Sequence, residues 1–133
     1  MKTHCFRLTK GQDLKESIKE YCIKNKIQAG TILSSVGCLY EVNLRMAGGK
    51  DYYTEIKDYE ILSLNGTVSM NGIHLHISLS DIKGNVLGGH LENGCFINTT
   101  CECILMEFDE FVFTREFDEN TGYKELVVKS VEF

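Results

Sequence analysis

Three of the four histidines in this sequence of 133 residues are the side chains best placed to do chemistry, because they lie close together between positions 74 and 90. In the run Ile73–Ser80 apolar and polar residues alternate, so on a β-strand His74 and His76 would project from the same face. Their Cα atoms would then be roughly 6.5 Å apart, near enough for both imidazoles to tilt toward one ion at about 2.0 to 2.1 Å. The spacing therefore permits these two rings to chelate a metal.

A pair of glycines precedes the third histidine, His90. Because Gly88 and Gly89 carry no side chains, the backbone there can pass close to another element or to a ligand, and it can bring His90 to the same point as the other two rings. Three neutral imidazoles are a common zinc set that leaves a fourth position for water or a ligand. The pattern alone is equally consistent with polar surface histidines, so both interpretations stay open at this point.

Other polar residues are weaker candidates for the site. Glu60, Glu92 and Glu102 could orient a metal-bound imidazole or act as a base, but surface charges or ion pairs at a sheet edge explain each of them more simply. His4 stands alone near the N-terminus, and we expect it to be structural. No second functional group stands at a spacing that demands catalysis.

One helix is predicted among the elements that must position these residues. Leu14, Ile18, Tyr21 and Cys22 recur at helical spacing, and the acidic residues before them and the lysines after them complement the helix dipole. This pattern predicts one main helix near the N-terminus, over about residues 12–25.

Strands are predicted for most of the remaining chain, and glycines separate them because the sequence contains no proline. Asn71–Gly72 lies between two alternating runs and predicts a hairpin with a type I′ turn. One early helix followed by many strands predicts the α+β class, with a strongly bent, mostly antiparallel β-sheet. The predicted strands are His4–Leu8, Thr31–Val36, Leu39–Met46, Tyr59–Ser69, Ile73–Ser80, Cys95–Phe113 and Leu126–Val131.

Length and composition are typical of one globular domain, which we expect to span residues 1–133. The hydrophobic fraction is 43% and the charged fraction 25%, and no apolar run approaches the roughly 18 residues needed to cross a bilayer. We therefore expect no membrane insertion. The net charge of -5 repels a phosphate backbone, which disfavours direct DNA binding.

The six cysteines form no Cys-x-x-Cys pair, and the N-terminal stretch has no pattern of an export signal. We therefore expect free thiols and a cytoplasmic location, where thiols stay reduced. Cys101 and Cys103 could share a metal, but small buried residues in a sheet are the simpler interpretation.

The sequence resembles the PPC domain family, the domain conserved between plants and prokaryotes that plants fuse to AT-hook motifs. The resemblance covers nearly the whole chain, and its most specific feature is the succession of His-x-His, a short turn and Gly-Gly-His-Leu. The matching residues are Gly30–Gly37, Tyr59–Gly66, His74–His76 with Ser78, Leu79 and Asp81, Gly84, Gly88–Leu91, Thr100, Glu102, Arg115, Asp118, Thr121, Gly122 and Leu126.

The resemblance implies a homotrimer in which the sheets of neighbouring subunits meet. It also implies zinc on His74, His76 and His90, because some prokaryotic relatives carry zinc on the corresponding histidines. In such a trimer Glu60, Arg115 and the loop 88–94 could lie near a subunit boundary and complete a pocket beside the metal. This chain departs from the plant proteins, since a sequence without proline cannot contain the Arg-Gly-Arg-Pro core of an AT-hook.

Two classes of function are therefore expected. The first is a stand-alone, trimeric protein that binds zinc or another divalent transition metal, and with it a small molecule; binding is favoured, and metal-assisted hydrolysis is the enzymatic alternative. The second is a DNA-associated or regulatory protein that acts through its trimer without an AT-hook, an expectation that rests on shared fold alone. A purely structural trimer with incidental histidines is the simplest alternative to both.

Overall fold

The computed structural model describes residues 1–132, which form one helix and eight β-strands. Six of the strands belong to one sheet, and the last two form a separate hairpin. In chain order the elements are β1 (Lys2–Thr9), α1 (Leu14–Lys24), β2 (Gly30–Arg45), β3 (Tyr52–Ser69), β4 (Gly72–Ser80), β5 (Val86–Leu91), β6 (Phe96–Glu107), β7 (Phe111–Asp118) and β8 (Tyr123–Ser130).

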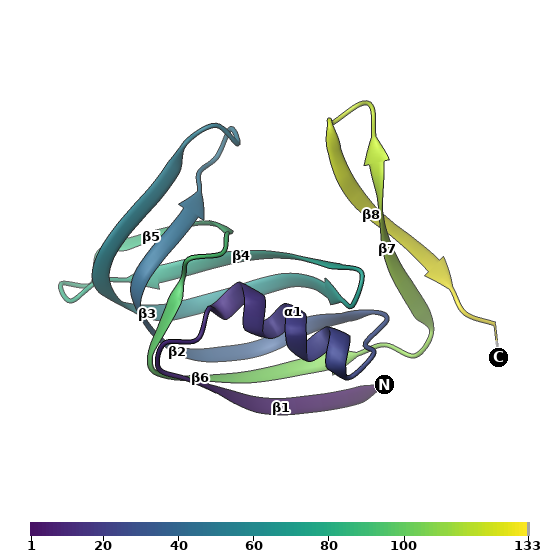
Figure 1. Cartoon of the computed structure of the whole chain (residues 1–133), viewed down its shortest axis with the longest axis horizontal. Helices are drawn as coiled ribbons and strands as arrows, with labels where there is room; N and C mark the ends of the chain where they lie inside the picture. Colours follow the sequence, from purple (N-terminus) through teal and green to yellow (C-terminus); the bar gives the residue numbers. More distant parts are fainter. Residues whose placement is uncertain (133) are drawn as a thin grey trace.

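The six-stranded sheet is curved and antiparallel, with the strand order β1-β6-β2-β3-β4-β5 (Figure 1). Its last strand, β5, also pairs with the end of β2 through Leu44–Leu91 and Arg45–His90. The strands β2, β3, β4 and β5 therefore close into a ring, in which β5 lies between β4 and β2. The hairpin of β7 and β8 extends beyond one end of this sheet (Figure 1).

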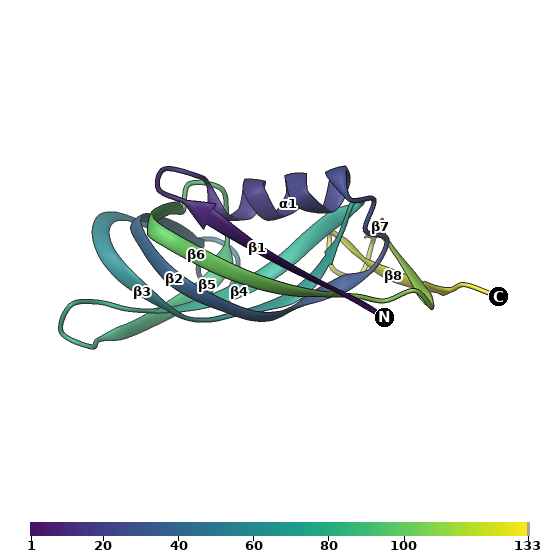
Figure 2. The same cartoon turned by 90° about the horizontal axis from the view of Figure 1, so that it is seen from below.

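The helix α1 covers one face of the sheet (Figure 2) and buries Leu14, Ile18 and Cys22 completely in the core. Asp13 caps its start: Oδ1 accepts a hydrogen bond from the backbone N–H of Glu16 at 2.9 Å. The other oxygen, Oδ2, accepts from the N–H of Gly94 at 2.6 Å, which ties the helix to the segment between β5 and β6. Within residues 1–132 no helix is long and apolar enough to cross a membrane.

The prediction of an α+β fold with one main helix was wrong. Strands make up 65% of the chain and helix only 8%, which places the fold closer to the all-β class. The residues with helical spacing do lie on a helix, but that helix has only 11 residues and covers a much larger sheet. A local periodicity reports that an element exists and not how much of the architecture it provides.

Several strand boundaries also differ from the predicted ones. Gly37 does not separate two strands, because it pairs with Ile61 and with Cys101 inside the continuous strand β2. The long predicted strand at 95–113 is divided into β6 and β7, which belong to different sheets. The sequence analysis missed β5 because Gly88 and Gly89 interrupt its pattern of side chains.

The predicted hairpin between β3 and β4 is confirmed, but its type I′ turn is not. Ser69 pairs with Gly72, so the two loop residues are Met70 and Asn71. Neither has the positive φ that a type I′ turn requires at both central positions. The side-chain amide of Asn71 instead donates to the carbonyl of Phe113 at 2.9 Å, which fixes the turn to β7.

Candidate metal centre

Strand register brings the three histidines together on one face of the sheet. His74 and His76 project from the same face of β4, while Leu75 between them is buried in the core. Across the antiparallel pairing of β4 with β5, His76 lies directly opposite His90. Residues opposite one another in such a pair point to the same side of the sheet, so His90 joins the other two rings.

The strand β5 fits between β4 and β2 because two of its central residues have no side chain. A Cβ atom at Gly88 would lie 2.5 Å from the carbonyl oxygen of Ile77, and one at Gly89 would lie 2.9 Å from that of Arg45. Both distances are well inside the separation at which non-bonded heavy atoms attract one another. The glycine pair is therefore what allows β5 to present His90 beside β4.

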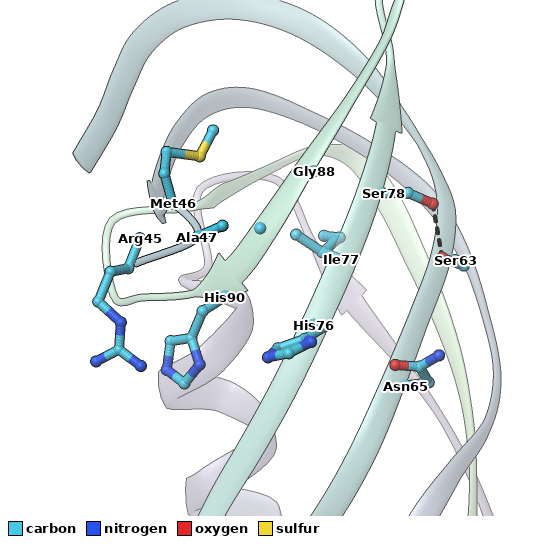
Figure 3. Close-up of a pocket in the computed structure, with 11 residues that line it drawn as sticks. Arg45, Met46, Ala47, Ser63, Asn65, His76, Ile77, Ser78, Gly88 and His90 are labelled. Atoms are coloured by element: carbon cyan, nitrogen blue, oxygen red, sulfur yellow. Dashed lines mark hydrogen bonds between the residues drawn. The ribbon is translucent and has the colours of Figure 1, made fainter. Parts of the chain in front are cut away.

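The three imidazoles form a compact cluster. Their ring centroids are 5.1 Å apart for His74 and His76, 5.0 Å for His74 and His90, and 5.6 Å for His76 and His90. One ring nitrogen of each residue lies within 4.8 Å of the others. Nitrogen ligands of a tetrahedral zinc ion would be about 3.4 Å apart, so small ring rotations bring all three onto one ion. Figure 3 shows the rings of His76 and His90 directed to the same side.

The surroundings favour the neutral form of imidazole, which is the form that binds metals. Burial, and after it the positive charge of Arg45, lower the pKa of His90 to about 4. Burial also lowers the pKa of His74, with smaller contributions from His76 and Arg115. Both rings are therefore able to accept a metal at neutral pH without first releasing a proton.

His90 has a ring nitrogen that lacks a partner within residues 1–132. Its Nδ1 atom is buried and makes no hydrogen bond there, which costs about 1 to 3 kcal/mol for a buried polar group. Its Nε2 atom lies 3.6 Å from Oε1 of Glu92, whose Oε2 lies 3.8 Å from Nζ of Lys15. A metal on Nδ1 would satisfy the buried nitrogen, and Nε2 would face a carboxylate of the kind that commonly orients a metal-bound histidine.

Three further residues proposed from the sequence border this cluster. Gly88 and Gly89 line a hollow of about 490 Å³ on one side of it, together with His76 and His90. Arg115 lines a second hollow of about 310 Å³ on the side of His74. Both volumes lie at or above the lower end of the range typical of small-molecule sites.

The other two glutamates lie away from the histidines of their own chain. Glu60 is exposed on β3 and pairs with Ser80, at the end of β4 remote from His74. Glu102 is exposed on β6, which pairs with β1 and β2 and not with β4. Neither carboxylate therefore orients a histidine within this chain.

The sequence analysis missed two neighbours of the cluster. Arg45 lies opposite His90, and Thr67 lies opposite His74, in the strand pairings of β2 with β5 and of β3 with β4. The only signal that could identify them is strand register. Register between β2 and β5 depends on the closure of the ring of strands, which no local sequence pattern specifies.

Comparison with known proteins finds relatives over most of the chain. The sequence profile of the Plants and Prokaryotes Conserved (PCC) domain matches residues 1–109. A hypothetical protein from Salmonella cholerae-suis (Salmonella enterica) has a structure similar to this one with a TM-score of 0.92 at 34% identity, over 97% of this chain and 94% of that chain. A protein from Archaeoglobus fulgidus described as metal-containing has a TM-score of 0.78 at 30% identity, over 96% of this chain and 94% of its own.

Two curated relatives are much longer than this chain. They are the bifunctional proteins GlmU from Synechococcus sp. strains JA-3-3Ab and JA-2-3B'a(2-13), each 39% identical over 131 residues. The matched region is 98% of this chain but only 21% of either relative. The similarity therefore concerns one part of those proteins.

Proposed function

This chain belongs to the Plants and Prokaryotes Conserved (PCC) domain family, and we propose that it is a metal-binding member that holds one zinc ion through His74, His76 and His90. The observation that carries the proposal is that one ring nitrogen from each of these residues lies within 4.8 Å of the others. The similar protein from Archaeoglobus fulgidus is itself described as metal-containing. Nickel, copper and iron also accept imidazole, but a set of three histidines is most often a zinc site.

Three protein ligands leave one position of a tetrahedral ion open to a small molecule. A bound zinc ion would polarise a group in that position and lower the pKa of bound water to about 7. Within residues 1–132 Glu92 is the only residue with a carboxylate oxygen within 4.0 Å of a ring nitrogen of the three histidines. That nitrogen is Nε2 of His90. Because the carboxylate of Glu92 is placed to orient the metal-binding ring of His90, we favour binding of a small molecule over metal-assisted hydrolysis.

Elemental analysis of the untagged protein tests this proposal. After exposure to zinc and dialysis against metal-free buffer, we expect one equivalent of zinc per chain. A His74→Ala, His76→Ala double variant should retain only trace metal, because a single remaining imidazole cannot hold an ion against dialysis. A wild-type protein that retains no zinc, nickel, copper or iron would contradict the proposal.

Acid should release the metal at a lower pH than ordinary histidines would allow. Protons compete with metal for each imidazole, and an unperturbed histidine takes up its proton near pH 6.5. Burial together with nearby positive charges brings the pKa of His90 to about 4 and lowers that of His74, so these two ligands stay neutral as the pH falls through 6.5. We expect dialysis at a series of pH values to show zinc retained at about pH 6 and lost toward pH 4. Half-release above pH 6.5 would contradict this expectation.

We propose that the protein assembles as a homotrimer, as its family resemblance implies. The helix covers one face of the curved sheet (Figure 2), and several apolar side chains of β2 and β3 are exposed to solvent. Leu33 and Val36 of β2 and Leu62 of the neighbouring strand β3 are 57%, 53% and 53% exposed. Contact between subunits would remove this apolar surface from water.

Sedimentation equilibrium tests the assembly. We expect a mass three times that of the 15.1 kDa chain. Leu62→Glu should dissociate the assembly, because it would bury a carboxylate in each contact. As a matched control, Ile23→Glu introduces the same charge at a helix residue that is 47% exposed, and the mass should not change. A wild-type mass of one chain would contradict the trimer.

We also propose a cytoplasmic location. All six cysteines are free thiols, and Sγ of Cys101 lies 3.7 Å from Sγ of Cys103 without a bond between them. Neighbouring unbonded thiols are typical of proteins in a reducing compartment.

A further inference from the structure

Two arginines flank the histidine cluster from opposite sides. Arg45, near the end of β2, is the direct strand partner of His90 and lies beside its ring (Figure 3). Arg115 comes from β7, and its Nη2 donates to Oγ1 of Thr67 at 3.0 Å. Because Thr67 lies opposite His74 in the pairing of β3 with β4, this contact places the Arg115 guanidinium on the His74 side of the cluster.

Neither guanidinium is held in a close ion pair within the part of the chain that the structure describes, although Glu125 lines the same hollow as Arg115 and opposes the lowering of its pKa by burial. No carboxylate of residues 1–132 forms an ion pair within 4.0 Å of either arginine. Arg45 lies over the ring of Tyr123, 5.4 Å from its centroid, which leaves its N–H donors unused. Arg115 makes the one side-chain hydrogen bond to Thr67, although a guanidinium has five donors.

The local charge is opposite to that of the whole chain. The net charge of the chain is -5, yet Arg45 and Arg115 both act on the histidines as positive charges. Lys15 and Glu92 form an ion pair at 3.8 Å, and Lys124 lines the same hollow as Glu125, the carboxylate that acts on His74 and Arg115, so each acidic group here has a lysine that offsets its charge. A divalent cation would add two further positive charges, so an anion would be attracted here and repelled by the remaining surface.

We propose that this site binds a small oxyanion, a carboxylate or a phosphate, with one oxygen on the open metal position and with Arg45 and Arg115 holding the other oxygens. This inference rests on the proposed metal centre. Planar guanidinium groups bind both kinds of oxyanion through paired N–H donors. The two hollows beside the arginines, of about 490 and 310 Å³, have room for a compact anion.

Calorimetric titration of the zinc-loaded protein with succinate and, separately, with inorganic phosphate tests this inference. We expect at least one of the two to bind, and Arg45→Gln and Arg115→Gln each to weaken that binding about tenfold or more, the loss expected for one charged hydrogen bond. Arg7→Gln is the matched control: it removes an exposed arginine from β1, which does not pair with β4 or β5, and should leave the affinity unchanged. Whichever probe binds identifies the class of anion.

Two further measurements keep the outcome clear. Circular dichroism and zinc content are measured first for each variant, and the two arginine substitutions serve as independent tests in case one of them disturbs the β7–β8 hairpin. The inference is overturned if the folded, zinc-loaded protein binds neither anion. It is also overturned if the Arg45→Gln and Arg115→Gln variants both bind the anion as tightly as the wild type. Failure of the unmodified protein to retain any metal would instead contradict the metal centre itself.

Discussion

His90→Ala should abolish stoichiometric zinc binding and leave the fold intact. The substitution removes one of the three ligands, and His90 is the only one of them that lies on β5. We expect the zinc affinity to fall by about two orders of magnitude or more, since even the loss of a residue that supports a ligand costs 10- to 100-fold. Competition with a chromophoric chelator measures the change. The fold should persist because the substitution breaks no hydrogen bond of Nδ1 within residues 1–132.

His4→Ala is the matched control for this experiment. His4 is buried, with Nε2 2.7 Å from Oε1 of Glu107 and Nδ1 2.9 Å from the hydroxyl of Tyr21. Its loss should lower the free energy of unfolding by about 1 kcal/mol, because it removes two hydrogen bonds to the half-buried side chains of Glu107 and Tyr21. Its zinc affinity should match that of the wild type. Equal zinc affinity of the His90→Ala variant and the wild type would contradict the assignment of the ligands.

Gly66→Ala should cause the largest loss of stability of any single methyl group added to the sheet. Gly66 has φ of 143° and pairs with Leu75, between the two histidines of β4. A Cβ atom there would lie 1.9 Å from the carbonyl oxygen of His74, so one of the two strands must move. Backbone strain and overpacking together predict a decrease of about 3 kcal/mol or more in the free energy of unfolding, measured with urea.

The same substitution should weaken zinc binding, because the displaced carbonyl belongs to a proposed ligand. Gly84→Ala is the matched control, since Gly84 also has a positive φ, of 82°, but a Cβ atom there would meet no heavy atom within 4 Å. That variant should lose only about 1 kcal/mol from backbone strain and should bind zinc as the wild type does. Equal losses of stability in the two variants would show that the close approach of β3 to His74 is not as described.

The sequence contains more information about the metal centre than about the fold that surrounds it. Strand alternation placed His74 and His76 on one face, and the glycine pair indicated a close approach of the segment that carries His90. Both expectations depend on local geometry, which a sequence reports directly. Arg45 could not be found in this way, because its position beside His90 depends on the pairing of β2 with β5.

The errors in the fold have the same physical origin. Glycines predicted breaks at Gly37 and at Gly88–Gly89, but in this protein they lie inside strands. The type I′ turn was predicted from Asn71–Gly72, yet register places Gly72 inside β4 and leaves Met70 in the loop. Which role a glycine takes is decided by the neighbouring strand, and that neighbour is distant in sequence.

A crystal structure of the zinc-loaded protein, with anomalous data collected at the zinc absorption edge, tests the central claim most directly. We expect one anomalous peak per chain, about 2.0 to 2.1 Å from a ring nitrogen of each of His74, His76 and His90. A peak bound by other side chains, or a map in which the three rings turn away from one another with no peak between them, would contradict the account.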